Sequence, residues 1–437
     1  MKRIIFLFML LWPLCVLAQT NKHINLSVVL EHALQHNQTL QAADMRTASA
    51  KLDLERSTAF ENPLFEFMTD DHEFSSNTNK NADAQGDMAG TDVAPMNKMA
   101  SMRQYRLTQM LPYPGKRGLL HDIAEKMLEQ SQSGALQSRN TLRFAVKSAY
   151  FQLLLNDQLR RYNEEAAYLM KQMASDALIR YRSGMADYAE VLKMQVEIQM
   201  VETDRIMLEG DRQAMVSMLA ALSYWPELDQ EGLQLSEDYS ADRHLNKQEI
   251  LLAAITNRPE LNAMRAMAAE KQLMADMAKR ETYPDFMLSA SLKEIPAEDR
   301  AAWGLGLGVK IPLFYADRQQ KEYASLSAQG RALNLDTAAM ETMLKAEIDE
   351  QLGRLSAIEK KISFLNSDVL PAAEQAWKIS VVRYRLGKIE LAMTLDSWRA
   401  RLEAKKQLAG ARSEREVILA TLEKITGLSM MEMTHEK

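Results

Sequence analysis

The sequence predicts a mostly α-helical chain that is internally duplicated and carries a small membrane-spanning β part. Three observations support this fold class. The motif RYRSG at residues 180–184 recurs as RYRLG at residues 383–387, 203 residues later. A proline-free stretch with helical periodicity runs from Lys116 to Ser183. Four shorter segments alternate between apolar and polar residues, which is the pattern of β-strands. Each half is therefore expected to contain helix, strand, loop, strand and a long helical hairpin.

The chain begins with a segment typical of a secretory signal peptide. Lys2 and Arg3 precede an apolar run at residues 4–17, so we expect residues 1–18 to be removed. The single cysteine, Cys15, lies within this segment. Its loss would exclude disulfides, thiolate metal sites and cysteine catalysis. Lipidation at Cys15 is an alternative, although the residues that precede it are poorly suited to such a cleavage.

The composition excludes several classes of function. Without the first eighteen residues the chain keeps 51 basic and 59 acidic residues, a net charge of −8, and no basic patch that would indicate nucleic-acid binding. There is no nucleophile–base pairing, phosphate loop or metal-ligand triad, so neither an enzyme nor a cofactor is expected. No later stretch has 18 consecutive apolar residues, so a membrane-spanning part would have to consist of strands.

The duplication sets the expected domain boundaries. Residues 19–222 form the first repeat and residues 247–437 the second. The connector at residues 223–246 has proline and glycine but no sustained periodicity. The segment between the two strands is longer in the first repeat, where the polar residues 71–98 predict a long exposed loop.

The four alternating segments predict membrane strands. Each is about as long as the 9–11 residues with which a tilted strand crosses a bilayer, and apolar residues alternate with polar ones as in barrel strands. The segments are Pro63–Asp70, Arg103–Leu111, Asp285–Glu294 and Ala301–Phe314. The residues expected to face lipid are Phe65, Phe67, Tyr105, Leu107, Phe286, Leu288, Trp303, Leu305, Leu307 and Val309.

Four strands cannot close a barrel, because an open sheet edge in lipid leaves backbone groups without partners. Strands must therefore be pooled among chains, with two chains supplying eight strands and three chains twelve. A soluble sandwich packed on the helices is the alternative. The glycines at 304, 306 and 308 also invite a nucleotide-loop interpretation, but no G-K-[ST] follows them.

Long helical hairpins are predicted next to the strands. Gly184 and Gly387 are suited to end the first helix of each hairpin. The returning helix of the first hairpin repeats every seven residues, which predicts left-handed coiled-coil packing. The first core position is occupied by Val191, Ile198, Arg205, Arg212 and Leu219. The second is occupied by Met194, Val201, Leu208, Met215 and Leu222. The two arginines either extend to the edge of the bundle or face a water-filled interior.

The repeats, strand pairs and hairpin turns together resemble the TolC-like outer-membrane efflux protein family. Shorter matches are NRPEL at residues 257–261, YPGKRG at 113–118 and VLPAAEQA at 369–376. The resemblance implies a homotrimer in the outer membrane of a Gram-negative bacterium, with a large periplasmic portion. Three chains would share a twelve-stranded β-barrel and a long periplasmic α-helical barrel. The partners implied are a periplasmic adaptor protein, an inner-membrane pump and outer-membrane lipid.

The resemblance also implies roles for particular residues. The hairpin turns would form the tip that docks the adaptor, through Arg180, Ser183, Gly184, Met185, Arg383, Leu386, Gly387 and Lys388. Family members narrow the entrance with acidic residues after the second turn, where this chain has Met393 and Asp396, and Glu190 occupies a comparable place after the first turn. A trimer would then carry a ring of three Asp396 carboxylates that favours cations. A solvated helix face is the alternative.

The 29 methionines bear on the cargo, because thioether sulfur is a soft ligand suited to copper(I) and silver(I). Methionine is also an adaptable core residue. The pattern resembles the heavy-metal, CusC/CzcC-like branch of the family, so an efflux duct for copper or silver is expected. His32 and His36 have the i, i+4 spacing of metal ligands but no evident third ligand, and the DDHE segment at residues 70–73 lies at a strand-to-loop edge, so no metal site is assigned. The alternatives are multidrug or bile-salt efflux, type I secretion, or a periplasmic coiled-coil scaffold without a pore.

Overall fold

The structure is a computed structural model that describes residues 23–70, 102–229, 234–237, 239–240, 245–295, 299–313 and 318–428. The predicted signal peptide at 1–18 and the predicted loop at 71–98 lie outside these residues. Among the described helices, none combines the length and the apolar character needed to cross a bilayer.

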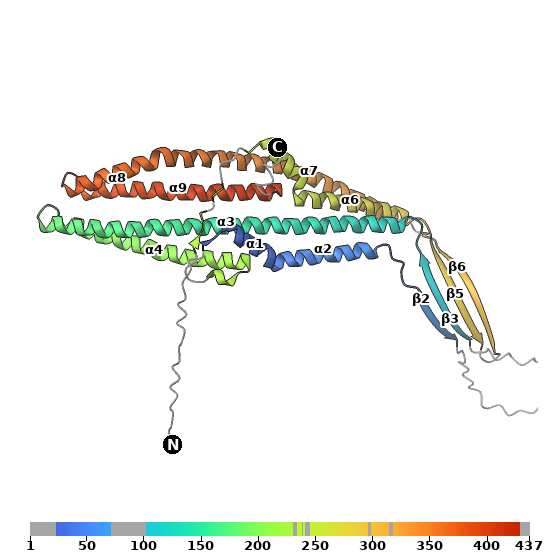
Figure 1. The fold of residues 1–437 in the computed structure, drawn as a ribbon. Helices are drawn as coiled ribbons and strands as arrows, with labels where there is room; N and C mark the ends of the chain where they lie inside the picture. The colour runs from blue at the N-terminus through green and yellow to red at the C-terminus, as the bar shows by residue number, and fades with distance from the viewer. Residues whose placement is uncertain are drawn as a thin grey trace, which may run out of the picture. The chain divides into compact units, whose positions relative to one another are not determined.

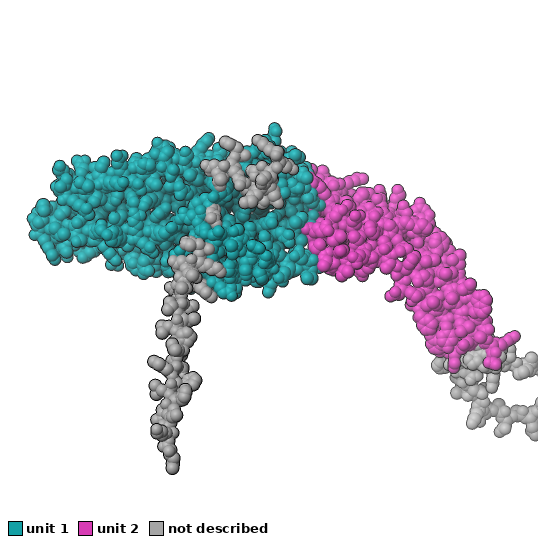
Figure 2. Space-filling model, viewed as in Figure 1, with its two compact units in different colours: residues 1–45, 133–262, 339–437 teal, residues 46–132, 263–338 magenta. Residues whose placement is uncertain are grey.

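The chain divides into two compact units, shown in teal and magenta in Figure 2. Unit 1 comprises residues 1–45, 133–262 and 339–437, and unit 2 comprises residues 46–132 and 263–338. Unit 1 contains the turns of the helical hairpins, and unit 2 contains the larger β-sheet. Each unit takes residues from both predicted repeats, so the compact units do not follow the order of the sequence.

The first half of the chain supplies four helices, of which α3 and α4 form a hairpin (Figure 1). Their bounds are α1 Leu26–His36, α2 Gln38–Arg56, α3 Lys116–Arg182 and α4 Tyr188–Ser223. Helix α3 begins at the predicted residue and ends one residue before the predicted end. The absence of proline from this stretch leaves its backbone hydrogen bonds uninterrupted.

The second half repeats this order with one difference. Its helices are α5 Lys247–Asn257, α6 Pro259–Arg280, α7 Gln319–Phe364, α8 Leu370–Arg385 and α9 Leu391–Thr426. A π-helical turn, η3 Leu365–Val369, separates α7 from α8, and the backbone N–H of Leu370 donates to the Leu365 carbonyl. Pro371, the second residue of α8, lacks the N–H that a regular helix needs, which accounts for the irregular turn here. This interruption is not predicted by the helical periodicity of the sequence.

The predicted connector contains a short 3₁₀ turn, η1 Pro226–Asp229, and a short strand, β4 Gln234–Leu235. Strand β4 pairs in parallel with β1 His23–Ile24. The hydroxyl of the buried Tyr150 on α3 donates to the carbonyl of Ile24 in β1 (3.1 Å) and to that of Ser236, directly after β4 (2.8 Å). The connector is thereby attached to the first long helix.

Unit 2 contains a four-stranded antiparallel sheet (Figure 1). Its strands are β2 Leu64–Asp70, β3 Met102–Leu111, β5 Asp285–Ile295 and β6 Arg300–Lys310, in the order β2-β3-β5-β6. The four predicted segments therefore form strands. The last prediction was too long, because β6 ends at Lys310 and not at Phe314. Pro312 cannot donate to a strand ladder, which explains the earlier end.

The strand register brings all ten residues expected to face lipid to one face of the sheet. Phe65 pairs with Leu107, and Leu288 pairs with Leu307. Cross-strand partners project on the same side of an antiparallel sheet. Trp303, Leu305 and Leu307 are 78%, 73% and 74% exposed, so none of the residues that the structure describes covers these three side chains. The other face carries Glu66, Arg106, Ser289, Ser291 and the three glycines of β6.

The core of the hairpins mixes aliphatic, aromatic and methionine side chains. One cluster contains the fully buried Met170, Met194 and Leu395 beside Trp377 and Tyr384. The predicted heptad on α4 is only partly correct. Val191, Met194, Val201 and Leu219 are buried, but Arg205 is exposed and pairs with Glu202, whereas Glu197 is buried between the expected positions. Arg212 donates to Asp157 on α3 at 2.9 Å.

Candidate functional site at the hairpin turns

The two hairpin turns end their first helices with the same hydrogen-bond pattern. Gly184 and Gly387 have φ values of 72° and 71°, in the left-handed region that favours glycine. The N–H of Gly184 donates to Tyr181, and the next N–H donates to Arg180; Gly387 and Lys388 repeat this with Tyr384 and Arg383. This pair of hydrogen bonds is the Schellman motif, so the RYR-x-G sequence encodes a helix stop in both repeats.

Arg180 connects the two turns. Its guanidinium donates to the backbone carbonyl of Tyr384 and, at 3.3 Å, to that of Met185. It also lies over the Tyr384 ring, with 4.4 Å between the guanidinium carbon and the ring centroid. A carbonyl at a helix C-terminus carries partial negative charge, which favours a cation at this place. Arg180 therefore holds the α8 terminus against the α3–α4 hairpin.

Tyr384 and Glu190 form a second contact between the hairpins. The Tyr384 hydroxyl donates to Glu190 Oε2 at 2.9 Å, and only 1% of the tyrosine is exposed. Burial, together with the hydrogen bond to the Glu190 carboxylate, raises the pKa of Tyr384 well above its ordinary value. The hydroxyl therefore keeps its proton throughout the physiological range and remains a donor.

The duplicated motifs are not used equally within one chain. Tyr181 is the repeat equivalent of Tyr384, yet it is 43% exposed and contacts Tyr188, with ring centroids 5.3 Å apart. Arg383 is the equivalent of Arg180, but its side chain is exposed and makes no hydrogen bond or ion pair within the described part of the chain. Arg180 of the first turn therefore contacts the second turn, whereas the equivalent Arg383 of the second turn makes no such contact with the first.

Further ion pairs join the hairpins away from the turns. Arg385 donates to Asp176 at 2.8 Å, and Arg399 donates to the buried Glu197. Glu165 on α3 accepts from Arg401 and Lys405 on α9, at 2.8 and 2.7 Å. Burial tends to raise the pKa of Glu165, but the two cationic donors prevail and lower it. These contacts fasten the two repeats along their length.

The residues predicted to dock an adaptor fall into two groups. Met185 and Leu386 are each 64% exposed, and Lys388 and Arg383 are exposed as well, so they are available to a partner. Arg180, Gly184 and Gly387 shape the turns, and Ser183 donates its hydroxyl to the carbonyls of Ile179 and Arg180. The residues that shape the turns therefore hold the exposed side chains in place at the ends of the hairpins.

The three predicted entrance residues differ in their exposure and contacts. Glu190 is engaged by Tyr384. Met393 is 58% exposed, and the Asp396 side chain is 74% exposed with an ion pair to Arg399 at 3.6 Å. The acidic side chain of Asp396 is thus available to solvent, while that of Glu190 is occupied by a contact inside the protein.

The histidines considered in the sequence have other roles. His32 and His36 stack with ring centroids 4.1 Å apart, and His32 also stacks on Trp225. Of the DDHE segment, residues 71–73 lie outside the described residues. Among the residues that the structure describes, His121, Asp122 and Glu125 of α3 offer three ligand atoms within 4.8 Å of one another on a half-exposed helix turn. This group was not among the metal-ligand candidates in the sequence.

The methionines divide between core and surface. Met170, Met173 and Met194 are buried in the hairpin core, where they fill space between aromatic residues. Met264, Met267, Met274 and Met277 lie on α6 in two pairs at i, i+3 spacing, and Met267 is 41% exposed. Met274 accepts from the ammonium of Lys271 at 3.7 Å.

The contacts between the hairpins could not be found from the sequence alone. The partners in each pair are about 200 residues apart, and neither residue type nor spacing indicates which arginine meets which carboxylate. The repeated RYR motif was the one available signal, because two copies of an unusual helix end suggested that both ends lie at one place.

Comparisons with known proteins agree with this geometry. Residues 251–428 match the family described as outer membrane efflux protein. The cobalt-zinc-cadmium resistance protein CzcC of Cupriavidus metallidurans is 23% identical over 313 residues, which cover 72% of this chain and 74% of that protein.

Solved outer-membrane proteins share the fold. VceC of Vibrio cholerae is 17% identical with a TM-score of 0.76, over 92% of this chain and 96% of that one. CusC is 15% identical with a TM-score of 0.73, over 92% of both chains. The family consists of transport channels, which agrees with the expectation that the chain is not an enzyme. Residues 251–428 therefore form an outer membrane efflux protein domain, which agrees with the family that the sequence features resemble.

Proposed function

We propose that this chain is the outer-membrane exit duct of a tripartite efflux system that passively conducts heavy-metal cations from the periplasm to the exterior. Three copies would pool their strands into a twelve-stranded barrel, and their hairpins would form a periplasmic α-helical barrel. The observation that carries the proposal is the open four-stranded sheet of unit 2. Its apolar face is exposed and its edge strands, β2 and β6, lack a neighbour on one side among the described residues.

The physical argument concerns the two edges. An unpaired strand edge in lipid costs several kcal/mol for each backbone group that lacks a partner, as an order of magnitude. Pairing β6 of one copy with β2 of the next removes every edge once the ring closes. Bacterial barrels have at least eight strands, which a single copy does not supply. The proposed homotrimer meets this requirement with twelve.

The hairpin turns supply the proposed periplasmic contacts. The exposed Met185 and Leu386 give the tip an apolar surface, flanked by Arg383 and Lys388. A surface of this kind suits an adaptor protein that presents apolar side chains with acidic neighbours. We assign the entrance to Asp396 and Met393 on α9. The nearby candidate Glu190 accepts a hydrogen bond from Tyr384.

The proposed cargo is a heavy-metal cation. The similarity to a cobalt–zinc–cadmium resistance protein supports this class, and the exposed Asp396 would favour cations over anions. The methionines favour copper or silver within the class, because their thioethers are soft ligands. However, the burial of Met170, Met173 and Met194 weakens the methionine argument for those three residues.

The duct is tested by extraction of the full-length protein. We expect it in the outer-membrane fraction, released by detergent as a trimer that resists heating in mild denaturant. Release into aqueous buffer as a monomer or as an elongated dimer would instead identify the scaffold without a pore and would overturn the proposal.

The cargo is tested by growth of a deletion strain on copper, silver, zinc, cobalt, cadmium, bile salts and hydrophobic dyes. The deletion strain should be sensitive to metals. If the intact gene restores metal resistance and an Asp396→Asn variant does not, cation efflux through this entrance is supported. Sensitivity confined to dyes and bile salts would overturn the metal cargo while leaving the duct in place.

A further inference from the structure

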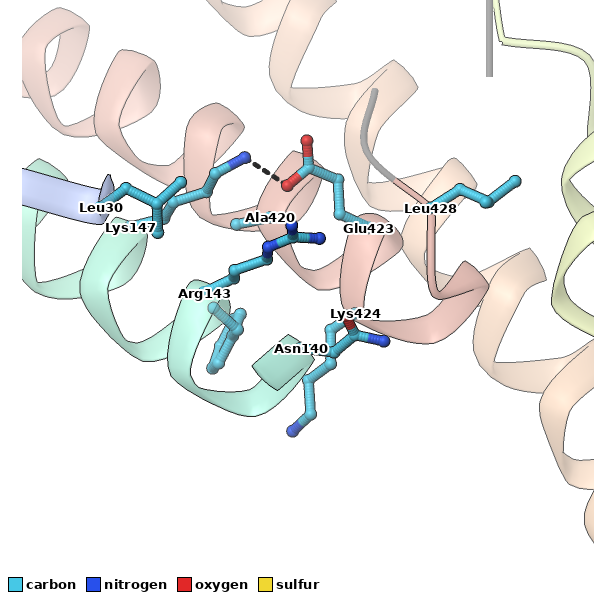
Figure 3. Close-up of a pocket in the computed structure, with 9 residues that line it drawn as sticks. Leu30, Asn140, Arg143, Lys147, Ala420, Glu423, Lys424 and Leu428 are labelled. Atoms are coloured by element: carbon cyan, nitrogen blue, oxygen red, sulfur yellow. Dashed lines mark hydrogen bonds and ion pairs between the residues drawn. The ribbon is translucent and has the colours of Figure 1, made fainter. Parts of the chain in front are cut away.

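A small cationic pocket lies between helices of the two repeats in unit 1 (Figure 3). Its volume is about 130 Å³. Helix α3 lines it with residues at helical spacings of three and four, α9 does the same, and α1 closes one side. The lining residues are Leu30, Asn140, Arg143, Phe144, Lys147, Ala420, Glu423, Lys424 and Leu428.

The charges of this α1–α3–α9 pocket do not balance. Three lining residues are cationic and one is acidic. Lys147 forms an ion pair with the single carboxylate, Glu423, and Lys424 lies 5.1 Å from the centroid of the Phe144 ring. Arg143 is partly buried, and its guanidinium makes no hydrogen bond or ion pair with any residue that the structure describes. Figure 3 shows its side chain extending from α3 toward α9.

A partly buried guanidinium needs a partner because it cannot release its proton. Five N–H donors directed into a pocket with apolar walls of Leu30, Ala420 and Leu428 would lack part of their hydration. The planar donor fork matches the oxygens of a phosphate or carboxylate in two parallel hydrogen bonds. The pocket volume of about 130 Å³ is sufficient for a small oxyanion.

We propose that the α1–α3–α9 pocket binds a small oxyanion of the phosphate or carboxylate class, with Arg143 as its main ligand and Lys424 as a supporting charge. The anion would compensate the excess positive charge and join α3 of the first repeat to α9 of the second. It would act beside the Lys147–Glu423 pair, which already links the same two helices. Oxyanion binding at this pocket would depend neither on the cargo nor on membrane assembly.

The test uses the full-length protein in detergent and inorganic phosphate as the probe. Phosphate is titrated against chloride at equal ionic strength while thermal unfolding is followed, and binding is measured by broadening of the phosphorus NMR line. We expect the unfolding temperature to rise with phosphate beyond the chloride series. Arg143→Gln should weaken binding about tenfold or more, which is the loss of one charge-assisted contact. Acetate in a parallel series separates carboxylates from phosphates within the proposed class.

Two comparisons separate a binding role from a structural one. In anion-free buffer, Arg143→Gln should unfold at the same or a higher temperature, because it removes an uncompensated charge. Arg139→Gln, an exposed arginine earlier on α3 and outside the pocket, should retain the full phosphate response. The proposal is overturned if neither oxyanion exceeds chloride, if Arg143→Gln keeps the response, or if it destabilises the anion-free protein.

Discussion

At the scale of single residues, the two arginines that open the duplicated motifs provide a matched pair. Arg180 bonds two carbonyls and covers the Tyr384 ring, whereas Arg383 is exposed. Arg180→Gln should lower the free energy of unfolding by about 1–3 kcal/mol, through loss of charged hydrogen bonds to the carbonyls of Tyr384 and Met185. Arg383→Gln should change it by less than about 0.5 kcal/mol. Thermal unfolding of the two variants decides this, and equal shifts would contradict the one-sided contact between the turns.

A second residue-scale prediction concerns Glu165 and acid. Its pKa lies below the ordinary value of 4.5 because Lys405 and Arg401 donate to the carboxylate and outweigh its partial burial. A lowered pKa contributes stability that is present above pH 4.5 and is lost as the pH falls through the lower, folded value. The side chain is 39% exposed, so the contribution should stay below about 1 kcal/mol.

The measurement compares the parent with Glu165→Gln in unfolding experiments from pH 7 to pH 3. The variant should be less stable at neutral pH, and the difference should shrink as the pH falls below 4.5. Glu164→Gln is the control, because Glu164 is exposed and its replacement should leave the profile unchanged. A constant difference across this range would show that the carboxylate charge does not contribute.

At the scale of elements, the clearest periodic patterns were predictable and the irregular turns were not. Helix α3 and strand β5 agree with the sequence within one residue, because long uninterrupted patterns of burial have few alternatives. The π-helical turn at Leu365–Val369 was missed, because helical periodicity continues through it on both sides. The buried Glu197 was also missed, since its burial depends on Arg399, a partner that local spacing does not reveal.

The glycines of β6 give the element-scale prediction. Glycine repeats suggested a nucleotide loop, but Gly306 lies across from Ser289 of β5, whose hydroxyl donates to its carbonyl at 3.3 Å. A Cβ at Gly306 would lie 2.6 Å from the Ser289 hydroxyl oxygen. Gly306→Val should therefore destabilise the sheet by about 1–3 kcal/mol, as overpacking does.

Rescue provides the control for this substitution. Adding Ser289→Gly to the valine variant removes the obstructing hydroxyl and should restore most of the lost unfolding temperature. If the double variant is no more stable than Gly306→Val alone, glycine is required at this position for a reason other than contact with β5.

At the scale of the whole molecule, the proposed membrane assembly depends on which face of the sheet meets lipid. Leu305 lies on the exposed apolar face, and Thr108 lies on the opposite one. A lysine facing the middle of a bilayer costs about 2–4 kcal/mol, and a trimer would carry three. Leu305→Lys should therefore abolish the heat-resistant trimer in outer-membrane fractions, whereas Thr108→Lys adds the same charge on the proposed interior and should preserve it. Survival of the trimer in both variants would mean that the apolar face does not contact lipid, and the exit duct would then need a different membrane surface.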